Sequence, residues 1–323
     1  MVIIHFFSGS GPKLLDATGQ GVLWGLMVLG VYITYKLLDI ADLTVDGSFA
    51  LGGCVCAMLI VQKGVNPFLA LFLATLAGMA AGLVTGALHT AFDIPAILAG
   101  ILTQLALWSV NLWVMGKSNT PLAKVDNMVS LLAESTGFSQ AKASQLIGIA
   151  AAIAVVALLY WFFGTEIGSA IRATGNNEDM IRALGVNTKW TKLLGLMISN
   201  GLVGLSGALV CQSQKYADVM MGQGAIVIGL AAIVIGEVLF GWFRNFALKL
   251  AAAVIGSVVY LCDPGRGAGA GNEPQLYEAF VRSHRGSGPF ACRWLPINGR
   301  PTGPTRKEEN SNAEADQCEQ DLQ

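Results

Sequence analysis

The sequence predicts an all-α, polytopic membrane protein with about eight membrane segments, and three observations support this prediction. Of its 323 residues, 54% are hydrophobic and 13% are charged, whereas an average soluble domain carries about 25% charged residues. A bilayer core of about 30 Å requires about 20 apolar residues per helix, and several runs come close to this length. Two runs carry glycines at three- or four-residue spacing, which allows membrane helices to pack closely: Gly78, Gly82, Gly86, Gly201, Gly204 and Gly207.

The apolar runs all lie within the first 260 residues. In chain order they cover 21–35 (extendable to 38), 68–88, 94–115, 146–163, 193–210, 225–240 and 246–260. A further run, 48–61, is apolar but too short to cross a bilayer alone. Residues 1–260 are therefore predicted to form one transmembrane domain. Cys54 and Cys56 are interpreted as small buried side chains, and no metal or cofactor site is predicted.

Composition changes near residue 261. Residues 261–323 contain 16 of the charged residues and 6 of the 10 prolines, without helical or strand periodicity. One interpretation is a disordered cytoplasmic tail. We favour a shifted reading frame, because the run 246–260 stops abruptly and a one-nucleotide shift, with suitable codons, would restore an apolar sequence. In that case the tail has no function and the chain lacks its last membrane segment.

Basic residues predict which loops face the cytoplasm. The loop 164–192 carries four of them, which are Arg172, Arg182, Lys189 and Lys192. The positive-inside rule places this loop in the cytoplasm. The loop 116–145, one span earlier, is then expected outside, although it holds three lysines. The loop 241–245, with Arg244, is expected to return to the cytoplasm, and the side of the N-terminus stays open.

A polar stretch within the loop 164–192, "AIRATGNNEDMIRALGVN" (170–187), predicts a short capped helix. Residues 166–174 extend the preceding helix and end at Gly175 as a helix-terminating glycine. Asn177 is a good N-cap for a new helix, acidic residues follow in its first turn, and Arg182 in its last turn matches the helix dipole. Gly185 ends this helix of about two turns. So short a helix is marginal alone in water, so it must rest on its own protein or on a partner.

Four segments of the chain resemble one family. "EIGSAIRATGNNEDMIRALGVNTKW" (166–190) resembles the cytoplasmic coupling segment of bacterial ABC-importer permeases of the branched-chain amino acid and ribose type. "LLDIADLTVDGSFALGG" (37–53), "AILAGILTQLALWSVNLWVMGKSN" (96–119) and "GLAAIVIGEVLFG" (229–241) resemble other segments of that family. The similarity covers most of residues 20–260. It is greatest to permeases of amino-acid uptake, of tryptophan or tyrosine type, while the interrupted C-terminus departs from the family.

The resemblance implies a role for residues 165–190, here called the elbow. In the family, a short helix at this place fits a cleft on the ATPase subunit and passes its motion to the membrane helices. Three apolar residues are expected to fill that cleft: Met180, Ile181 and Leu184. Four polar residues are expected at its rim: Arg172, Asn176, Asn177 and Arg182. Gly175 and Gly185 are expected to set the ends of the helices.

Three aspartates, Asp39, Asp42 and Asp46, separate the first apolar run from 48–61. They form either an acidic surface loop or a broken, re-entrant segment near 37–61, with 48–61 as a half-helix. Irregular backbone at membrane depth is tolerated only inside protein or along a cavity. Asp46 or Ser48 would cap the half-helix, whose N-terminus can meet a substrate carboxylate. The resemblance favours the broken segment.

Polar side chains within other runs are candidates for the translocation pathway. Glu237 is costly inside a membrane unless it faces a cavity or a partner. It is either a pathway residue or part of a structural hydrogen bond. Gln104 and Asn111 are seven residues apart and share a helix face. That face lines a pore or holds helices together, and we favour the second interpretation.

The stretch "NLWVMGKS" (111–118) nearly matches a phosphate-binding loop, but Asn111 replaces its first glycine and an apolar run precedes it instead of a strand. The chain is therefore predicted to have no ATPase of its own and to be no enzyme. The leading prediction is the permease subunit of an ATP-driven importer in the bacterial inner membrane, translocating a small polar solute, preferably an amino acid. An ion-coupled secondary transporter is the alternative. Expected partners are ABC ATPase subunits, a solute-binding protein, a second identical or related permease and the lipid bilayer; the net charge of −1 does not indicate nucleic acid.

Overall fold

The computed structural model describes residues 11–123, 125, 127–137, 139–240 and 245–262. All of them belong to one unit, Met1–Pro264. The tail from residue 263 onwards lies outside the described residues, and so does Arg244. The interpretations of the tail as disordered or frame-shifted therefore stay predictions.

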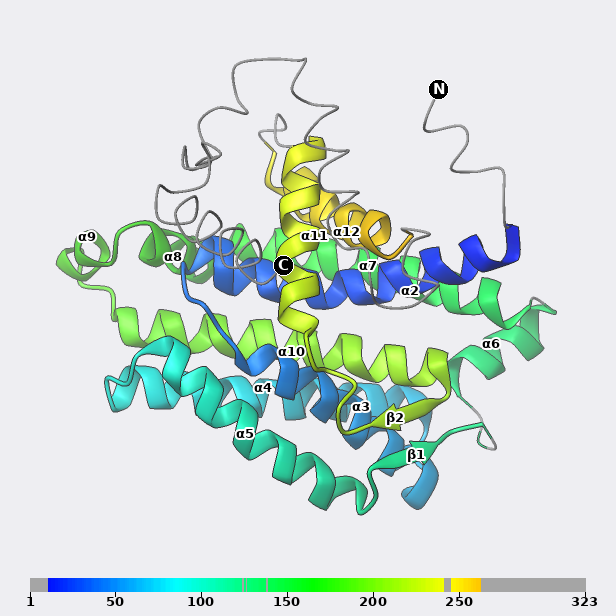
Figure 1. Ribbon diagram of the computed structural model, residues 1–323. Helices are drawn as coiled ribbons and strands as arrows, with labels where there is room; N and C mark the ends of the chain where they lie inside the picture. Colours follow the sequence, from blue (N-terminus) through cyan, green and yellow to red (C-terminus); the bar gives the residue numbers. More distant parts are fainter. Residues whose placement is uncertain (1–10, 124, 126, 138, 241–244, 263–323) are drawn as a thin grey trace, which may run out of the picture. The chain divides into compact units, whose positions relative to one another are not determined.

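Helices dominate the described residues (Figure 1). The first half contains α2 (Gly11–Tyr32), the π-helical turn η1 (Ile33–Leu37), α3 (Thr44–Lys63), α4 (Pro67–Ala91), α5 (Ala96–Met115), β1 (Asn119–Pro121) and α6 (Met128–Thr136). The second half contains α7 (Gln140–Phe163), α8 (Glu166–Asn176), α9 (Glu178–Ala183), α10 (Thr188–Gln214), β2 (Tyr216–Asp218), α11 (Ala225–Phe240) and α12 (Phe246–Leu261). The two short strands pair antiparallel, with Thr120 opposite Ala217.

Among the described residues, six helices are long and apolar enough to cross a membrane. They are Ala17–Leu37, Thr44–Lys63, Pro67–Ala91, Ala96–Met115, Lys142–Phe163 and Thr188–Gln214. Two shorter apolar helices follow, Ala225–Phe240 and Phe246–Leu261. The all-α prediction is therefore confirmed, with six candidate spans and two shorter apolar helices where about eight membrane segments were expected.

The prediction that residues 48–61 form a half-helix is wrong. Helix α3 has 20 residues and reaches from Thr44 to Lys63. It begins four residues earlier because a carboxylate oxygen of Asp42 accepts a hydrogen bond from the Thr44 backbone N–H at 2.9 Å. It ends at Gly64, which has a φ of +61°. Residues 38–43, between η1 and α3, are not helical.

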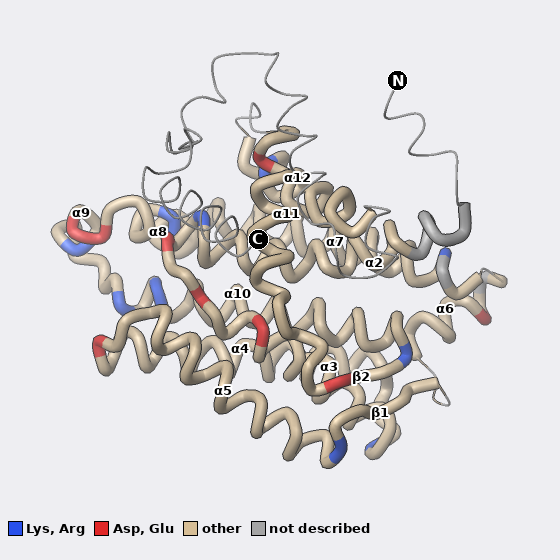
Figure 2. The backbone as a smooth tube through the Cα atoms, in the orientation of Figure 1, with Lys and Arg blue, Asp and Glu red and all other residues tan. Residues whose placement is uncertain are grey.

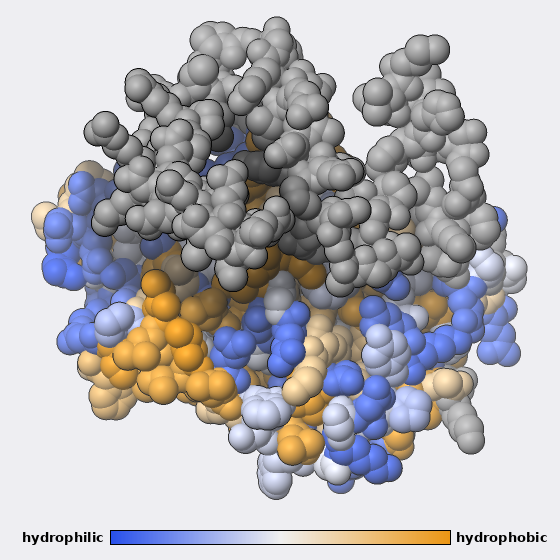
Figure 3. Space-filling model, viewed as in Figure 1, coloured by the Kyte–Doolittle hydropathy of each residue, from blue (hydrophilic) through white to orange (hydrophobic). Residues whose placement is uncertain are grey.

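Helices α2, α3 and α10 form the inside of the bundle. In each of these helices, 72% of the most apolar 18-residue stretch is buried inside the structure, compared with 33% or less in α4, α5 and α7. Large apolar side chains of these outer helices are exposed, including Phe72 of α4 and Trp113 of α5. Figure 3 shows an apolar surface over α4 and α5, which suits contact with lipid or with another membrane subunit.

Helix α10 is the centre of the bundle and packs against α2, α3 and α4. Small hydroxyl side chains bind α10 and α12 to the backbone of α2. Ser199 donates to the Gly30 carbonyl at 2.8 Å, Ser206 to the Leu23 carbonyl at 2.7 Å, and Ser257 of α12 to the Gly21 carbonyl at 2.7 Å. The 27 residues of α10 span about 40 Å. Helix α9 precedes α10 in the chain and β2 follows it (Figure 1). Charged residues gather near both ends of α10, whereas the outer helices carry few along their length (Figure 2).

Candidate functional site: the elbow and the polar contacts around α3

Two helices, α8 and α9, form most of the elbow. Helix α7 ends at Phe163, and the Thr165 hydroxyl accepts a hydrogen bond from the Gly168 N–H at 3.3 Å as the N-cap of α8. The expectation that residues 166–174 continue the preceding helix is therefore wrong, because this cap starts a new one. Gly168 packs against the end of α7, so that α8 turns away from it.

The expected role of Gly175 is also wrong. Gly175 lies inside α8, one residue before its last, and does not have a positive φ. A Cβ at this position would overlap the backbone carbonyl of Leu37 in η1. Glycine is required there because α8 approaches the backbone of η1 closely, and not because the helix ends.

Helix α9 has the predicted ends. The Asn177 side chain accepts a hydrogen bond from the Met180 N–H at 3.0 Å, and Gly185 follows the helix with a φ of +83°. Its apolar residues do not share one environment, however. Met180 is 49% and Leu184 71% exposed, whereas Ile181 is only 5% exposed. Ile181 therefore packs into its own chain, and of the three expected docking residues only Met180 and Leu184 face outward.

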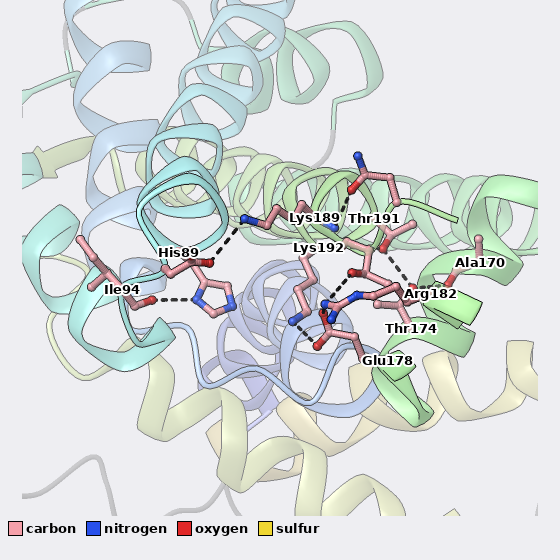
Figure 4. A network of polar contacts seen from close by, with 12 residues as sticks. His89, Ile94, Ala170, Thr174, Glu178, Arg182, Lys189, Thr191 and Lys192 are labelled. Atoms are coloured by element: carbon pink, nitrogen blue, oxygen red, sulfur yellow. Dashed lines mark hydrogen bonds and ion pairs between the residues drawn. The ribbon is translucent and has the colours of Figure 1, made fainter. Parts of the chain in front are cut away.

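Polar contacts hold the elbow on the start of α10 (Figure 4). Glu178 forms ion pairs with Arg182 at 2.9 Å and with Lys192 at 2.5 Å. The Thr174 and Thr191 hydroxyls lie 3.0 Å apart. The hydrogen bond from Lys192 lowers the pKa of the Glu178 carboxyl below its ordinary value, against the opposing effect of burial. Helix α9 is therefore attached to α10 by charge as well as by packing.

The expected rim residues of the elbow have different surroundings. Asn176 and Asn177 are exposed, and Arg182 is exposed beside Glu178. The Arg172 guanidinium lies 4.7 Å from the centre of the Phe246 ring at the start of α12. Arg172 therefore connects α8 to α12. A surface hollow of about 310 Å³ lies between α8 and the start of α10, with Ile167, Ala170 and Trp190 in its wall.

The predicted pathway residues near α3 make contacts between helices. Asp46 accepts hydrogen bonds from the backbone N–H groups of Ile226 at 2.9 Å and Gly224 at 3.1 Å, at the start of α11. The Ser48 hydroxyl donates to the Asn200 side chain at 2.7 Å. Neither residue caps α3, so that expectation is wrong: the N-cap position is Leu43, and Asp42 before it accepts from the N–H of Thr44, the first residue of the helix.

The polar face of α5 lies against the start of α3. Asn111 is buried, and its side-chain amide donates a long hydrogen bond, 3.4 Å, to the Gly47 carbonyl. The Gln104 Cα lies 3.3 Å from where a Cβ on Gly47 would be. Both residues therefore line the α3–α5 contact. Within the described part of the chain, the Asn111 side-chain oxygen has no hydrogen-bond partner.

Glu237 of α11 has an ionic partner. Its carboxylate lies 2.8 Å from the Lys36 Nζ in η1, and both side chains are almost half exposed. The pair links α11 to the same π-helical turn that Gly175 of α8 approaches.

The predicted packing glycines lie where helices come closest. A Cβ on Gly78 would overlap the Asn200 carbonyl, and one on Gly82 the Leu196 carbonyl, both on α10. Gly204 faces Gly78 across the same contact. The other three glycines each face an apolar residue of a neighbouring helix: Gly86 faces Leu193, Gly201 faces Met79 and Gly207 faces Phe49.

Comparison with known proteins decides the family. Residues 14–273 match the family described as branched-chain amino acid transport system / permease component. The chain belongs to this family of permeases.

Curated relatives agree with this assignment. A tyrosine transport system permease protein of Clostridioides difficile (strain R20291) is 39% identical over 247 residues, which cover 76% of this chain and 80% of the relative. An uncharacterized protein of Rickettsia prowazekii (strain Madrid E) is 35% identical, covering 76% and 86%. The D-allose transport system permease protein AlsC of Escherichia coli (strain K12) is 27% identical, covering 74% and 69%.

As a member of this permease family, the chain is the membrane subunit of an ABC importer and crosses the bacterial inner membrane several times. It is a transport protein and not an enzyme. The family implies an ATPase and a solute-binding protein as partners. The alternative of an ion-coupled secondary transporter is therefore set aside.

Sequence reasoning missed two polar residues of this permease, Asn200 and Lys36, and did not single out Asp42 among the three aspartates. Asn200 and Asp42 bind each other, and Lys36 pairs with Glu237. The signal for Asn200 was available, because an amide inside the apolar run 193–210 needs a hydrogen-bonding partner. No pattern in the sequence indicates which partner it finds.

Proposed function

We propose that this permease translocates an amino acid, preferably an aromatic one such as tyrosine, and that its elbow is the docking site of the ATPase. The docking proposal depends on the exposure of Met180 of α9 and of Leu184, which directly follows it. Helix α9 is also attached to α10 by the ion pair between Glu178 and Lys192. Two exposed apolar side chains on so short a helix suit insertion into a partner's cleft. The tyrosine permease relative supports the choice of substrate.

The docking proposal is tested by matched substitutions of two methionines. Met180 of the elbow and Met220, which follows β2 beyond the other end of α10, are both 49% exposed. We expect Met180→Asp and Leu184→Asp to abolish co-purification of the ATPase, while the permease still inserts. Met220→Asp should leave co-purification unchanged. Normal recovery of the ATPase with both elbow variants would refute the proposal.

The substrate proposal is tested with the reconstituted complex. Proteoliposomes that contain the permease and ATPase, with the solute-binding protein outside, are supplied with labelled tyrosine, leucine or ribose. We expect ATP-dependent uptake of tyrosine above the other two. Uptake of ribose alone would assign this permease to sugars.

We further propose that the pathway passes along α3 and α5 and that two such permeases, identical or related, enclose it. Three of the expected pathway residues, Asp46, Gln104 and Asn111, surround Gly47, with Ser48 next to it and Glu237 on the neighbouring α11. Substrate protection of a cysteine introduced at Gln104 against a polar thiol reagent would support this course. Equal labelling with and without substrate would argue against it.

A further inference from the structure

A buried amide near the middle of α10 connects this helix to two other segments. The Asn200 Nδ2 donates to a carboxylate oxygen of Asp42 at 2.7 Å and to the Leu196 carbonyl at 3.1 Å. The Asn200 Oδ1 accepts from the Ser48 hydroxyl at 2.7 Å. Asn200 and Ser48 are completely buried and Asp42 is 3% exposed. The amide uses both of its ends, so its orientation is determined.

Asp42 is the only member of this group on irregular backbone. It belongs to residues 38–43 between η1 and α3. Its other oxygen accepts from the Thr44 N–H, so each of the two oxygens accepts a hydrogen bond. Among the ion pairs of the described residues none includes Asp42. Its carboxyl group is therefore held by hydrogen bonds alone, and losing one of them in a buried place is expensive.

The same irregular segment also touches the elbow. Gly175 of α8 lies against the backbone of Leu37 and Leu38, and the Leu38 side chain packs on Gly195 of α10. Residues 38–43 are thus contacted by α8 at their start and by Asn200 near their end. Helix α10, which carries Asn200, is separated from α9 by the four residues 184–187.

We propose that Asp42 and Asn200 are a positioning pair that makes residues 38–43 and the start of α3 move together with α10. The inference rests on the proposed function, in which the ATPase acts on the elbow. A displacement of the elbow then reaches residues 38–43 in two ways, through Gly175 of α8 and through Asn200 of α10. The buried pair makes the segment move by the same amount as α10. Both side chains are buried inside the bundle, away from the elbow surface, so we expect their loss to weaken the coupling of ATP hydrolysis to transport and to leave ATPase docking intact.

The test compares single substitutions with their exchange in the complete complex of permease, ATPase and solute-binding protein. Asn200→Asp places two carboxyl groups together, and Asp42→Asn places two amides together. The double exchange restores the contact between the two positions: an amide at position 42 accepts from Thr44 and donates to the carboxylate introduced at position 200, which also accepts from Ser48. The hydrogen bond to the Leu196 carbonyl is the one that it does not restore.

We expect each single variant to lower the ratio of solute taken up to ATP hydrolysed by about tenfold, the effect of leaving one buried hydrogen-bonding group unsatisfied. The double variant should recover most of that ratio. Ser199→Ala is the matched control, because it removes a buried hydrogen bond from the same helix without touching residues 38–43. The ATPase should co-purify with all four variants.

Two results would overturn the inference: an unchanged uptake ratio in both single variants, or no recovery in the double variant although its ATPase binding is normal. If Asn200→Asp does not insert, Asp42→Asn, which introduces no charge, gives the same readout. Failure of the proposed function is distinct, since the unaltered complex would then take up no amino acid or the elbow variants would retain the ATPase.

Discussion

The Lys192 ammonium of α10 lies 2.5 Å from the Glu178 carboxylate of α9, and this contact joins the elbow to α10. Glu178 also pairs with Arg182 one helical turn away. The pairing lowers the pKa of Glu178, with the Lys192 hydrogen bond as the largest cause. Because this carboxyl is one-third exposed, the stabilisation is of the size of a surface ion pair, up to about 1 kcal/mol.

This pairing predicts a pH dependence of stability. The pKa of Glu178 is lower in the folded than in the unfolded protein, so its contribution is complete above the ordinary glutamate pKa of about 4.3 and is lost as pH falls through the lower folded value. The thermal stability of the unaltered permease minus that of Glu178→Gln, measured at each pH, removes the contributions of the other titrating groups, because both proteins contain them. We expect a constant positive difference at neutral pH that shrinks below pH of about 4. A difference that grows on acidification would contradict this sign.

The close approach of α8 to η1 predicts that Gly175 tolerates no side chain. Gly175→Leu should destabilise the permease by about 1–3 kcal/mol, because the added atoms must displace the Leu37 backbone. The neighbouring Asn176 is exposed, so Asn176→Leu adds the same side chain where nothing obstructs it. Thermal unfolding in detergent should separate the two variants. Equal stability would mean that α8 does not lie on η1.

The contact of α4 with α10 makes a similar prediction for the inside of the bundle. Gly78→Leu should lower stability by about 1–3 kcal/mol or more, because rigid backbone of α10 occupies the space. Ala80, two residues along α4, is exposed, and Ala80→Leu should change stability by less than about 0.5 kcal/mol. Unfolding midpoints measured in the same detergent provide the comparison. If Ala80→Leu proves the more damaging, the orientation of α4 is wrong.

The two hydrogen bonds of Asp46 predict that it stabilises the start of α11. Asp46→Ala should cost about 0.5–2 kcal/mol, the usual loss on removing a helix N-cap, while Asp46→Asn keeps one acceptor and should cost less. Asp93 is a suitable control, because its side chain is 81% exposed and its ion pair with Lys189 is long, 3.5 Å. Asp93 also has a φ of +54°, which asparagine tolerates and alanine does not, so the control substitution is Asp93→Asn, and it should have little effect. Hydrogen exchange of the first turn of α11 measures the local change, and unaltered exchange in Asp46→Ala would exclude the capping role.

Patterns along the chain were sufficient for the apolar helices and for the ends of α9, although not for the ends of α3 and α8. Apolar run length indicates membrane helices because lipid offers no hydrogen bonds to the backbone, and this requirement holds for each segment separately. Asn177 and Gly185 were readable as the ends of α9 because caps depend on residues only a few positions apart. The glycine series in α4 and α10 indicated close packing, because a residue without a Cβ lets the backbone of a neighbouring helix approach.

The tertiary structure decided every contact between residues distant in the chain. Gly175 has the same local sequence whether it ends a helix or faces η1, and only the position of Leu37 distinguishes the two. Ile181 lies among exposed neighbours in the sequence, yet it is buried because α9 rests on α10. Asp42, Asp46 and Glu237 are costly inside a bilayer wherever they occur. Which donor or cation satisfies each of them depends on how the helices pack, because that partner comes from another helix or loop.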